Sequence, residues 1–385
     1  MNSTRTLVVQ ILLFAVTLIT TSLAGAEWMF GRPFDLPLFE IENPLGWTHF
    51  WQGFQFSIPF LGILTVHEFG HYFTAKHHKV KVTLPYYIPF WIGLGQSIGT
   101  LGAFIRIKEL IRSRKKYFDI GIAGPLAGFV VALGVLWYGF ANLPTLDYIF
   151  KIHPEYQKFG LGFARVVYEN QSMSGNILLG DNLIFHFFKT YVADPTRLPP
   201  PQEMMHYPLL LAGYLALFFT SLNLIPIGQL DGGHILYGLV GTKTYRWVSP
   251  LLLFVFVTYS GLGVYRPEEF AITDDEAFWE KLGYLGLYIF FLRFCFSRVD
   301  ENTPSTAWLL ALLSVAVQLG ISLIFPTWEG YSGFLAFAFL LGRVLGVHHP
   351  PTDDREPLDT KRKILGWIAL LVFILCFSPK PFVVL

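Results

Sequence analysis

Charged residues and cysteines are scarce in this chain of 385 residues. Asp, Glu, Lys and Arg make up only 14% of it and hydrophobic residues 53%, which excludes an ordinary soluble domain and indicates a protein of the lipid bilayer. A net charge of +1 gives no basis for nucleic acid as a partner. The two cysteines, Cys295 and Cys376, lie far apart in apolar segments, so neither a disulfide framework nor a cysteine-based zinc site is encoded.

Long apolar runs dominate the sequence instead. A run of about 20 apolar residues can cross a bilayer as a helix, so we predict an all-α polytopic membrane protein with about nine transmembrane helices. The runs lie at approximately residues 7–26, 51–75, 120–142, 207–224, 247–264, 282–296, 306–325, 332–347 and 364–377. The first run also suits a signal peptide cleaved near Ala26. We favour a retained helix because the run is long for a signal.

The second apolar run contains three ionisable residues, His67, Glu68 and His71. Charge at membrane depth is costly, so such residues usually indicate function. On a helix, His67 and His71 lie one turn apart on one face and can bind the same divalent metal, while Glu68 lies beside them. This is the H-E-x-x-H pattern of metalloproteases. Paired histidines on a core helix also occur as ordinary hydrogen-bonded residues, and that alternative stays open at this point.

A second motif, between Asn223 and His234, offers what the first lacks. Zinc bound by two histidines needs a third protein ligand and an open position for water. Asp231 is the carboxylate that we choose, its alternative being an N-cap or turn residue beside Gly232 and Gly233. His234 is compatible with a partner of the metal ligands or with a substitute ligand.

These two motifs, together with the run Gly124-Pro-Leu-Ala-Gly128, resemble the site-2 protease family of intramembrane zinc metalloproteases. The resemblance extends from about Ile58 to Leu239, nearly half of the chain. For residues 124–128 we expect a packing role, because small residues at helical spacing let membrane helices approach closely.

The resemblance implies one Zn²⁺ per chain, with His67, His71 and Asp231 as its ligands. It also implies Glu68 as the catalytic acid and base and Asn223 as a contact for the substrate. A merely structural, hydrogen-bonding role for Asn223 is almost as well supported by the residues themselves.

The segment between Val82 and Ile107 is apolar but interrupted by prolines and glycines, which resist a continuous helix. Non-helical backbone at membrane depth must be buried in protein or line a wet cavity. We therefore expect a small re-entrant β segment near the active site; a surface loop that grips the membrane is the alternative. Residues 85–90 and 102–106 are similar to the branch of the family that includes chloroplast members.

The longest polar interruption lies between residues 143 and 206. We expect small amphipathic pieces that form an extracytoplasmic cap. Its histidines, His153, His186 and His206, are predicted to be ordinary surface or interfacial residues. The pair His348 and His349 is predicted to lie in a solvated loop.

Charge between the spans predicts the orientation of the protein. Lys and Arg cluster in residues 106–116 and should lie in the cytoplasm, whereas the acidic segment 268–280 should lie outside. This arrangement places the N-terminus and the active-site side in the cytoplasm. We expect five regions along the chain. Residues 1–50 form a first helix with its outer loop, and residues 51–142 form the H-E-x-x-H core. Residues 143–206 form the cap, residues 207–241 form the core helix with the second motif, and residues 242–385 form accessory helices.

The predicted function is hydrolysis of peptide bonds within or near transmembrane segments. The expected substrates are single-pass, often regulatory, proteins of the lipid bilayer, and an upstream site-1-type protease is a possible partner. Glu68 would act on water activated by zinc, and Pro226 would break the helix so that Asn223 and Asp231 reach the cleft. The rivals are a transporter or channel with an intramembrane ion site, and a catalytically silent relative that binds membrane proteins. Transport gives no reason for Glu68 to stand beside two histidines at this spacing.

Overall fold

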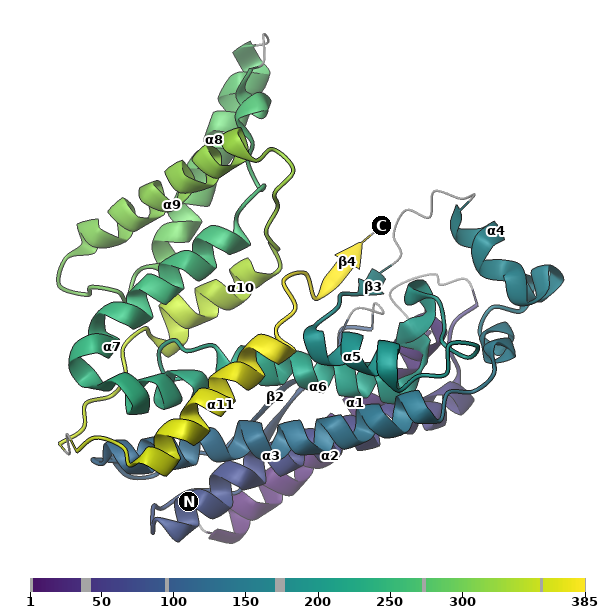
Figure 1. Cartoon of the computed structure of the whole chain (residues 1–385), viewed down its shortest axis with the longest axis horizontal. Helices are drawn as coiled ribbons and strands as arrows, with labels where there is room; N and C mark the ends of the chain where they lie inside the picture. The colour runs from purple at the N-terminus through teal and green to yellow at the C-terminus, as the bar shows by residue number, and fades with distance from the viewer. Residues whose placement is uncertain are drawn as a thin grey trace. The chain divides into compact units, whose positions relative to one another are not determined.

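The computed structural model describes residues 3–35, 43–93, 97–169, 177–271, 275–353 and 356–384, and it is mostly helical (Figure 1). The chain divides into two compact units. The first unit comprises residues 1–111, 122–222 and 371–385, and the second comprises residues 112–121 and 223–370. Each unit is described below by itself.

The first unit is built around helices that lie side by side. Its first elements are α1 (Ser3–Phe30), α2 (Trp47–His77), β1 (Tyr86–Phe90), β2 (Gly99–Phe104) and α3 (Arg114–Ala141), the last from residue 122 onward. Helices α1 and α2 pack closely along their length (Figure 1). A Cβ on Gly53 would lie 1.9 Å from the carbonyl oxygen of Ser22, and the hydroxyls of Ser22 and Ser57 are hydrogen-bonded at 2.8 Å. Small residues thus allow the two backbones to touch.

Strands β1 and β2 form an antiparallel hairpin within the segment where strands were predicted. The register is irregular between Tyr87 and Pro89, as expected for a proline within a sheet. The hairpin packs against α1, where Gly99 has φ +86° and a Cβ would lie 2.3 Å from Cα of Thr21. The predicted strands are therefore confirmed, apart from residues 94–96, which lie outside the described residues; their depth in a membrane stays a prediction.

The cap predicted between residues 143 and 206 consists of short pieces in the first unit. They are η1 (Leu146–Lys151), η2 (Pro154–Gly162), α4 (Phe163–Glu169), β3 (Ile177–Leu179), α5 (Leu183–Tyr191) and η3 (Pro201–His206), followed by α6 (Pro208–Leu224). Strand β3 pairs with β4 (Phe382–Val384) near the end of the chain. The hydroxyl of Tyr214 on α6 donates to the carbonyl of Pro381 at 2.6 Å, which ties the same tail to the helix.

The second unit is helical throughout its regular elements. These are α7 (Asp231–Ser260), η4 (Pro267–Phe270), α8 (Asp275–Cys295), α9 (Pro304–Ile324), α10 (Phe334–Phe339) with its π-helical continuation Leu340–Leu345, and α11 (Thr360–Cys376) up to Leu370. Helix α7 is kinked at Gly241, whose φ is +76°. The carbonyl of Gly238 accepts hydrogen bonds from the guanidinium of Arg114 beside this kink, at 3.1 and 2.7 Å. The stretch after Asp231 is therefore a helical segment of its own.

Three helices in the described residues are long and apolar enough to cross a membrane: Thr4–Phe30, Arg114–Ala141 and Pro304–Ile324. Two shorter apolar helices are Pro208–Leu224 and Phe334–Leu345. Each of the nine apolar runs overlaps a helix, so the mostly helical fold is confirmed. Nine membrane crossings stay a prediction, because helices such as α2 and α7 combine apolar stretches with polar residues.

Candidate metal centre

The H-E-x-x-H residues lie on the regular helix α2, in the first unit. The side chains of His67, Glu68 and His71 are almost fully buried, with 6%, 4% and 7% of their residue surfaces exposed. The Nε2 atoms of the two imidazoles lie 3.1 Å apart, and the rings meet edge to face. Oε1 of Glu68 lies 3.9 Å from Nε2 of His67. The predicted one-turn geometry is present, with the carboxylate beside the paired imidazoles.

The two imidazoles fit a shared metal ion by their separation. Zn–N bonds of about 2.0–2.1 Å in tetrahedral geometry place two nitrogens roughly 3.3–3.4 Å apart. The 3.1 Å between the Nε2 atoms of His67 and His71 is close to that value and also suits an N–H···N hydrogen bond. The donor set is chemically appropriate for zinc, and the metal-binding role of these residues stays a prediction.

Two glycines of α3 make room for the paired imidazoles. A Cβ on Gly124 would lie 2.2 Å from Nε2 of His71, and one on Gly128 would lie 3.1 Å from Cβ of His67. The four-residue spacing of the glycines matches that of the histidines, so each glycine faces one ring. The packing role predicted for residues 124–128 is confirmed, and the structure adds that the packed partners are the histidines themselves.

The β-hairpin is anchored beside this part of α2. The hydroxyls of Thr65 on α2 and Tyr87 on β1 are hydrogen-bonded at 2.8 Å, and Tyr87 is buried. Thr65 precedes His67 by two residues. Among the described residues β1 and β2 form a two-stranded sheet, and the side chain of Leu101 on β2 is 60% exposed. The structure therefore places a strand next to the helix that carries the candidate ligands.

The second motif lies at a break between two helices. Helix α6 ends at Leu224 and α7 begins at Asp231, so the helix break predicted at Pro226 is confirmed. The chain folds back tightly here, since a Cβ on Gly232 would lie 2.0 Å from the carbonyl oxygen of Leu224. Asn223 is half-buried in the last turn of α6.

Asp231 is the first residue of α7, where a carboxylate is favoured by the helix dipole. This position suits both of the roles considered for Asp231, a turn residue and a metal ligand. Asp231 and Asn223 belong to the second unit and the two histidines to the first. The convergence of His67, His71 and Asp231 on one ion therefore stays a prediction.

His234 has a partner that sequence reasoning missed. Its Nδ1 lies 2.8 Å from Nε2 of His349, which stacks on the ring of Tyr237 with centroids 3.7 Å apart. Burial lowers the pKa of His349 to about 3, so its imidazole is neutral at neutral pH. The prediction of a solvated pair is wrong for His349, whereas its neighbour His348 is exposed. The partners are 115 residues apart, and no local pattern connects them.

Comparison with known proteins places this geometry in a family. The model of peptidase family M50 matches residues 55–258, a range that includes both motifs and more than half of the chain. The chain belongs to peptidase family M50. This confirms the resemblance to site-2 proteases that the motifs indicated.

Several curated relatives of this M50 chain carry the name "Probable zinc metalloprotease" and are chloroplastic. EGY2 of Oryza sativa subsp. indica is 30% identical over 196 residues, covering 50% of this chain and 30% of the relative. EGY1 of Arabidopsis thaliana is 27% identical over 272 residues, covering 70% and 42%. EGY2 of Arabidopsis thaliana is 28% identical over 248 residues, covering 59% and 39%. The chain thus spans less than half of the length of these relatives.

The names of these relatives bear on the metal and on the class of protein. Zinc is the metal that they imply, and the family together with the apolar helices supports a membrane protein. Similarity to chloroplastic members, which residues 85–90 and 102–106 suggested, is confirmed.

Proposed function

We propose that this M50 chain is an intramembrane zinc metalloprotease that hydrolyses peptide bonds within or near transmembrane segments of membrane-anchored proteins. The observation that carries the proposal is the buried pair of imidazoles on α2, with Nε2 atoms 3.1 Å apart and the Glu68 carboxylate beside them. A buried carboxylate next to two potential zinc ligands is costly to maintain without a chemical role.

His67, His71 and Asp231 would hold one zinc ion. When bound, zinc lowers the pKa of water toward neutrality and polarises a carbonyl group. Glu68 accepts the proton of the attacking water and later returns it to the leaving nitrogen. The amide of Asn223 would contact the substrate. Gly124 of α3 leaves room for the imidazole of His71, because a larger residue there would collide with that ring.

The proposed substrate class rests on the family resemblance and on the expected position of the site within the bilayer. The proposed substrates are single-pass membrane proteins, already trimmed by a site-1-type protease, that enter from the bilayer. The N-terminus and the active-site side would face the cytoplasm. A transmembrane helix must unwind before its peptide bonds can be attacked, because its own hydrogen bonds shield them.

The exposed part of β2 offers a way to hold an unwound substrate by strand addition. Leu101 lies at the irregularity of the β1–β2 register and is not among the paired residues of this hairpin, so a substitution there leaves the assigned pairs in place. Replacing Leu101 with Pro removes one backbone donor and should slow cleavage, whereas Leu101→Ala should not. Equal cleavage rates for the two variants would remove the strand-addition step from the proposal.

The decisive experiment uses the purified full chain, reconstituted in vesicles with a panel of single-pass helices. Wild type should cleave some of them, whereas Glu68→Ala and a chelator-treated sample should not. His71→Ala should also be inactive, and His77→Ala is its matched control because His77 is an exposed histidine at the end of the same helix. Cleavage unaffected by both Glu68→Ala and the chelator would exclude the protease and favour the rivals, an ion transporter or a silent relative.

A further inference from the structure

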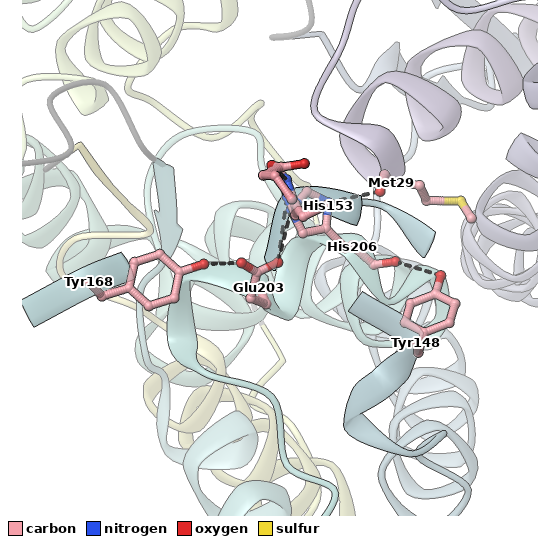
Figure 2. A network of polar contacts seen from close by, with 7 residues as sticks. Met29, Tyr148, His153, Tyr168, Glu203 and His206 are labelled. Carbon is pink, nitrogen blue, oxygen red and sulfur yellow. Dashed lines mark hydrogen bonds and ion pairs between the residues drawn. The ribbon is translucent and has the colours of Figure 1, made fainter. Parts of the chain in front are cut away.

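The cap contains a second group of two histidines and a carboxylate, His153, Glu203 and His206 (Figure 2). Glu203 and His206 lie one turn apart on η3, and His153 directly precedes η2. Nε2 of His206 lies 3.4 Å from both Nε2 of His153 and Oε2 of Glu203, and the remaining distance, from His153 to Glu203, is 3.8 Å. Three potential metal-ligand atoms therefore form a compact triangle.

The histidines present their Nε2 lone pairs toward this triangle. Nδ1 of His206 lies 2.8 Å from the carbonyl oxygen of Met29, which can only accept, so the ring carries its proton on Nδ1 (Figure 2). Nδ1 of His153 lies 3.2 Å from a carboxylate oxygen of Glu155 and donates to it in the same way. Each outward nitrogen is thus bound by an acceptor, as is usual for histidines that ligate a metal.

The carboxylate of Glu203 is oriented similarly. Tyr168 donates its hydroxyl proton to Oε1, so that Oε2 turns toward the histidines (Figure 2). The side chain of Glu203 is only 2% exposed, and within the described part of the chain Oε2 has no hydrogen-bond partner. Three potential ligand atoms thus converge in a buried place, where a positive charge at the centre would compensate the buried carboxylate.

We propose that His153, Glu203 and His206 bind a second divalent metal ion of the zinc class, which joins the start of η2 to η3 within the cap. Tetrahedral zinc with bonds of about 2.0–2.2 Å spaces its ligands roughly 3.3–3.6 Å apart, close to the observed triangle. Two imidazoles and one carboxylate suit zinc rather than calcium or magnesium, which prefer oxygen ligands. The side chain of His153 is 25% exposed, which leaves a route for the ion and for a fourth ligand.

A proton shared between Glu203 and an imidazole is the competing occupant of the triangle, because the three ligand atoms lie within 3.4–3.8 Å of one another. The experiment must distinguish the metal from that proton.

The second site is separate from the H-E-x-x-H residues. The rings of Phe30, adjacent to Met29 in sequence, and His49 on α2 touch with centroids 4.7 Å apart. His67 follows His49 by 18 residues on the same helix, a rise of about 27 Å. The cap cluster therefore lies too far from His67 to share its ion, and the inference stands whether or not the protein cleaves peptides.

The test counts zinc by elemental analysis in the full chain, purified without a histidine tag and equilibrated with a buffered zinc concentration. Wild type should hold two ions per chain, His71→Ala one, Glu203→Gln one, and the double variant none. His186→Ala should keep both, because His186 is a cap histidine with a 62% exposed side chain. A wild type with a single ion, lost completely in His71→Ala, would overturn the proposal, as would retention of both ions in Glu203→Gln.

The first part of a second measurement leaves the cap unaltered and so does not depend on the folding of a cap variant. Co²⁺ added to metal-free His71→Ala protein should give the visible absorption of four-coordinate cobalt. Adding Tyr168→Phe should weaken that binding about tenfold or more, as loss of a ligand's supporting hydrogen bond usually does. Absence of both the absorption and bound cobalt would show that a proton occupies the triangle, and the metal site would be rejected.

Discussion

Two groups of histidine and carboxylate in the first unit differ in how their side chains are held. On α2, the side chains of His71 and His67 pack closely against Gly124 and Gly128 of α3, where an added Cβ would lie 2.2 Å from Nε2 of His71 and 3.1 Å from Cβ of His67. In the cap, the imidazoles of His153 and His206 are positioned by hydrogen bonds from their Nδ1 atoms. The same residue types thus pack against glycines in one place and are hydrogen-bonded to a carboxylate and a backbone carbonyl in the other.

The difference indicates what each group can do. In the cap, Glu203 has one oxygen bound to Tyr168 and the other facing the histidines, so the carboxylate is fixed as a ligand. On α2, Glu68 lies 3.9 Å from the nearest ring nitrogen of His67, a distance that leaves it beside the potential ligands. A carboxylate at this distance can act on a water molecule near the ligands, whereas one that faces the ligands can bind the ion itself.

The same isosteric substitution should therefore have opposite effects at the two sites. Glu68→Gln keeps the shape of the side chain and removes its basicity, so cleavage should fall by about 10²–10⁴-fold while both zinc ions remain. Glu203→Gln should lose one zinc ion and reduce cleavage far less. Zinc content and kcat/KM, measured on the same preparations, check both expectations.

The distinction would be broken by two results. If Glu68→Gln lost zinc from α2, Glu68 would be a ligand and not a base. If Glu203→Gln lowered kcat/KM as strongly as Glu68→Gln, the cap cluster would take part in catalysis.

The close packing of α3 against the histidines of α2 can be tested by adding a methyl group at Gly124. Gly124→Ala would place its Cβ 2.2 Å from Nε2 of His71, so the imidazole must move. We expect loss of zinc from α2 and a fall in kcat/KM of about 10²-fold, since an error of about 1 Å in a catalytic group has that effect. The cap zinc should remain.

The matched control is Gly134→Ala, on the same helix, where a Cβ meets no atom within 4 Å. It should retain zinc and activity and be slightly more stable, because Ala is a better helix former than Gly. If Gly124→Ala behaved like Gly134→Ala, the histidines would not depend on the shape of α3.

Local patterns explain which features the sequence could predict. His67 and His71 lie four residues apart, so the helical repeat alone brings them together. Pro226 predicts a helix break from local sequence alone. The prolines and glycines of residues 82–107 likewise predict the absence of a continuous helix in the segment that forms the hairpin. Contacts between residues far apart in the sequence leave no local pattern that would predict them. The pairing of Leu178 with Val383 joins residues about 200 positions apart, and the cap cluster needs His153 beside residues about 50 positions later.

Burial of polar groups was the other feature that sequence could not show. His206 follows a polar, proline-rich stretch and was expected at the surface, yet it is only 5% exposed and hydrogen-bonded to Met29 of α1. The prediction of an ordinary surface or interfacial residue is therefore wrong for His206. His186, which has a largely exposed side chain, conforms to it. A histidine's environment depends on tertiary contacts that its neighbours in sequence do not reveal.

A third histidine pair, His234 and His349 in the second unit, extends the comparison. Nε2 of His349 lies 2.8 Å from Nδ1 of His234, and its Nδ1 lies 2.7 Å from the carbonyl oxygen of Pro350. Burial holds the pKa of His349 near 3, below its usual value of 6.5, so the unfolded chain binds a proton more readily than the folded one. The stabilising effect of the neutral ring is complete above about pH 6.5 and is lost as the pH falls toward 3.

We expect the melting temperature in detergent to fall between pH 7 and 5, and the His349→Phe variant to show a smaller fall. His348→Phe, at the exposed neighbour, should keep the wild-type slope, and an unchanged slope in His349→Phe would show that His349 does not cause it.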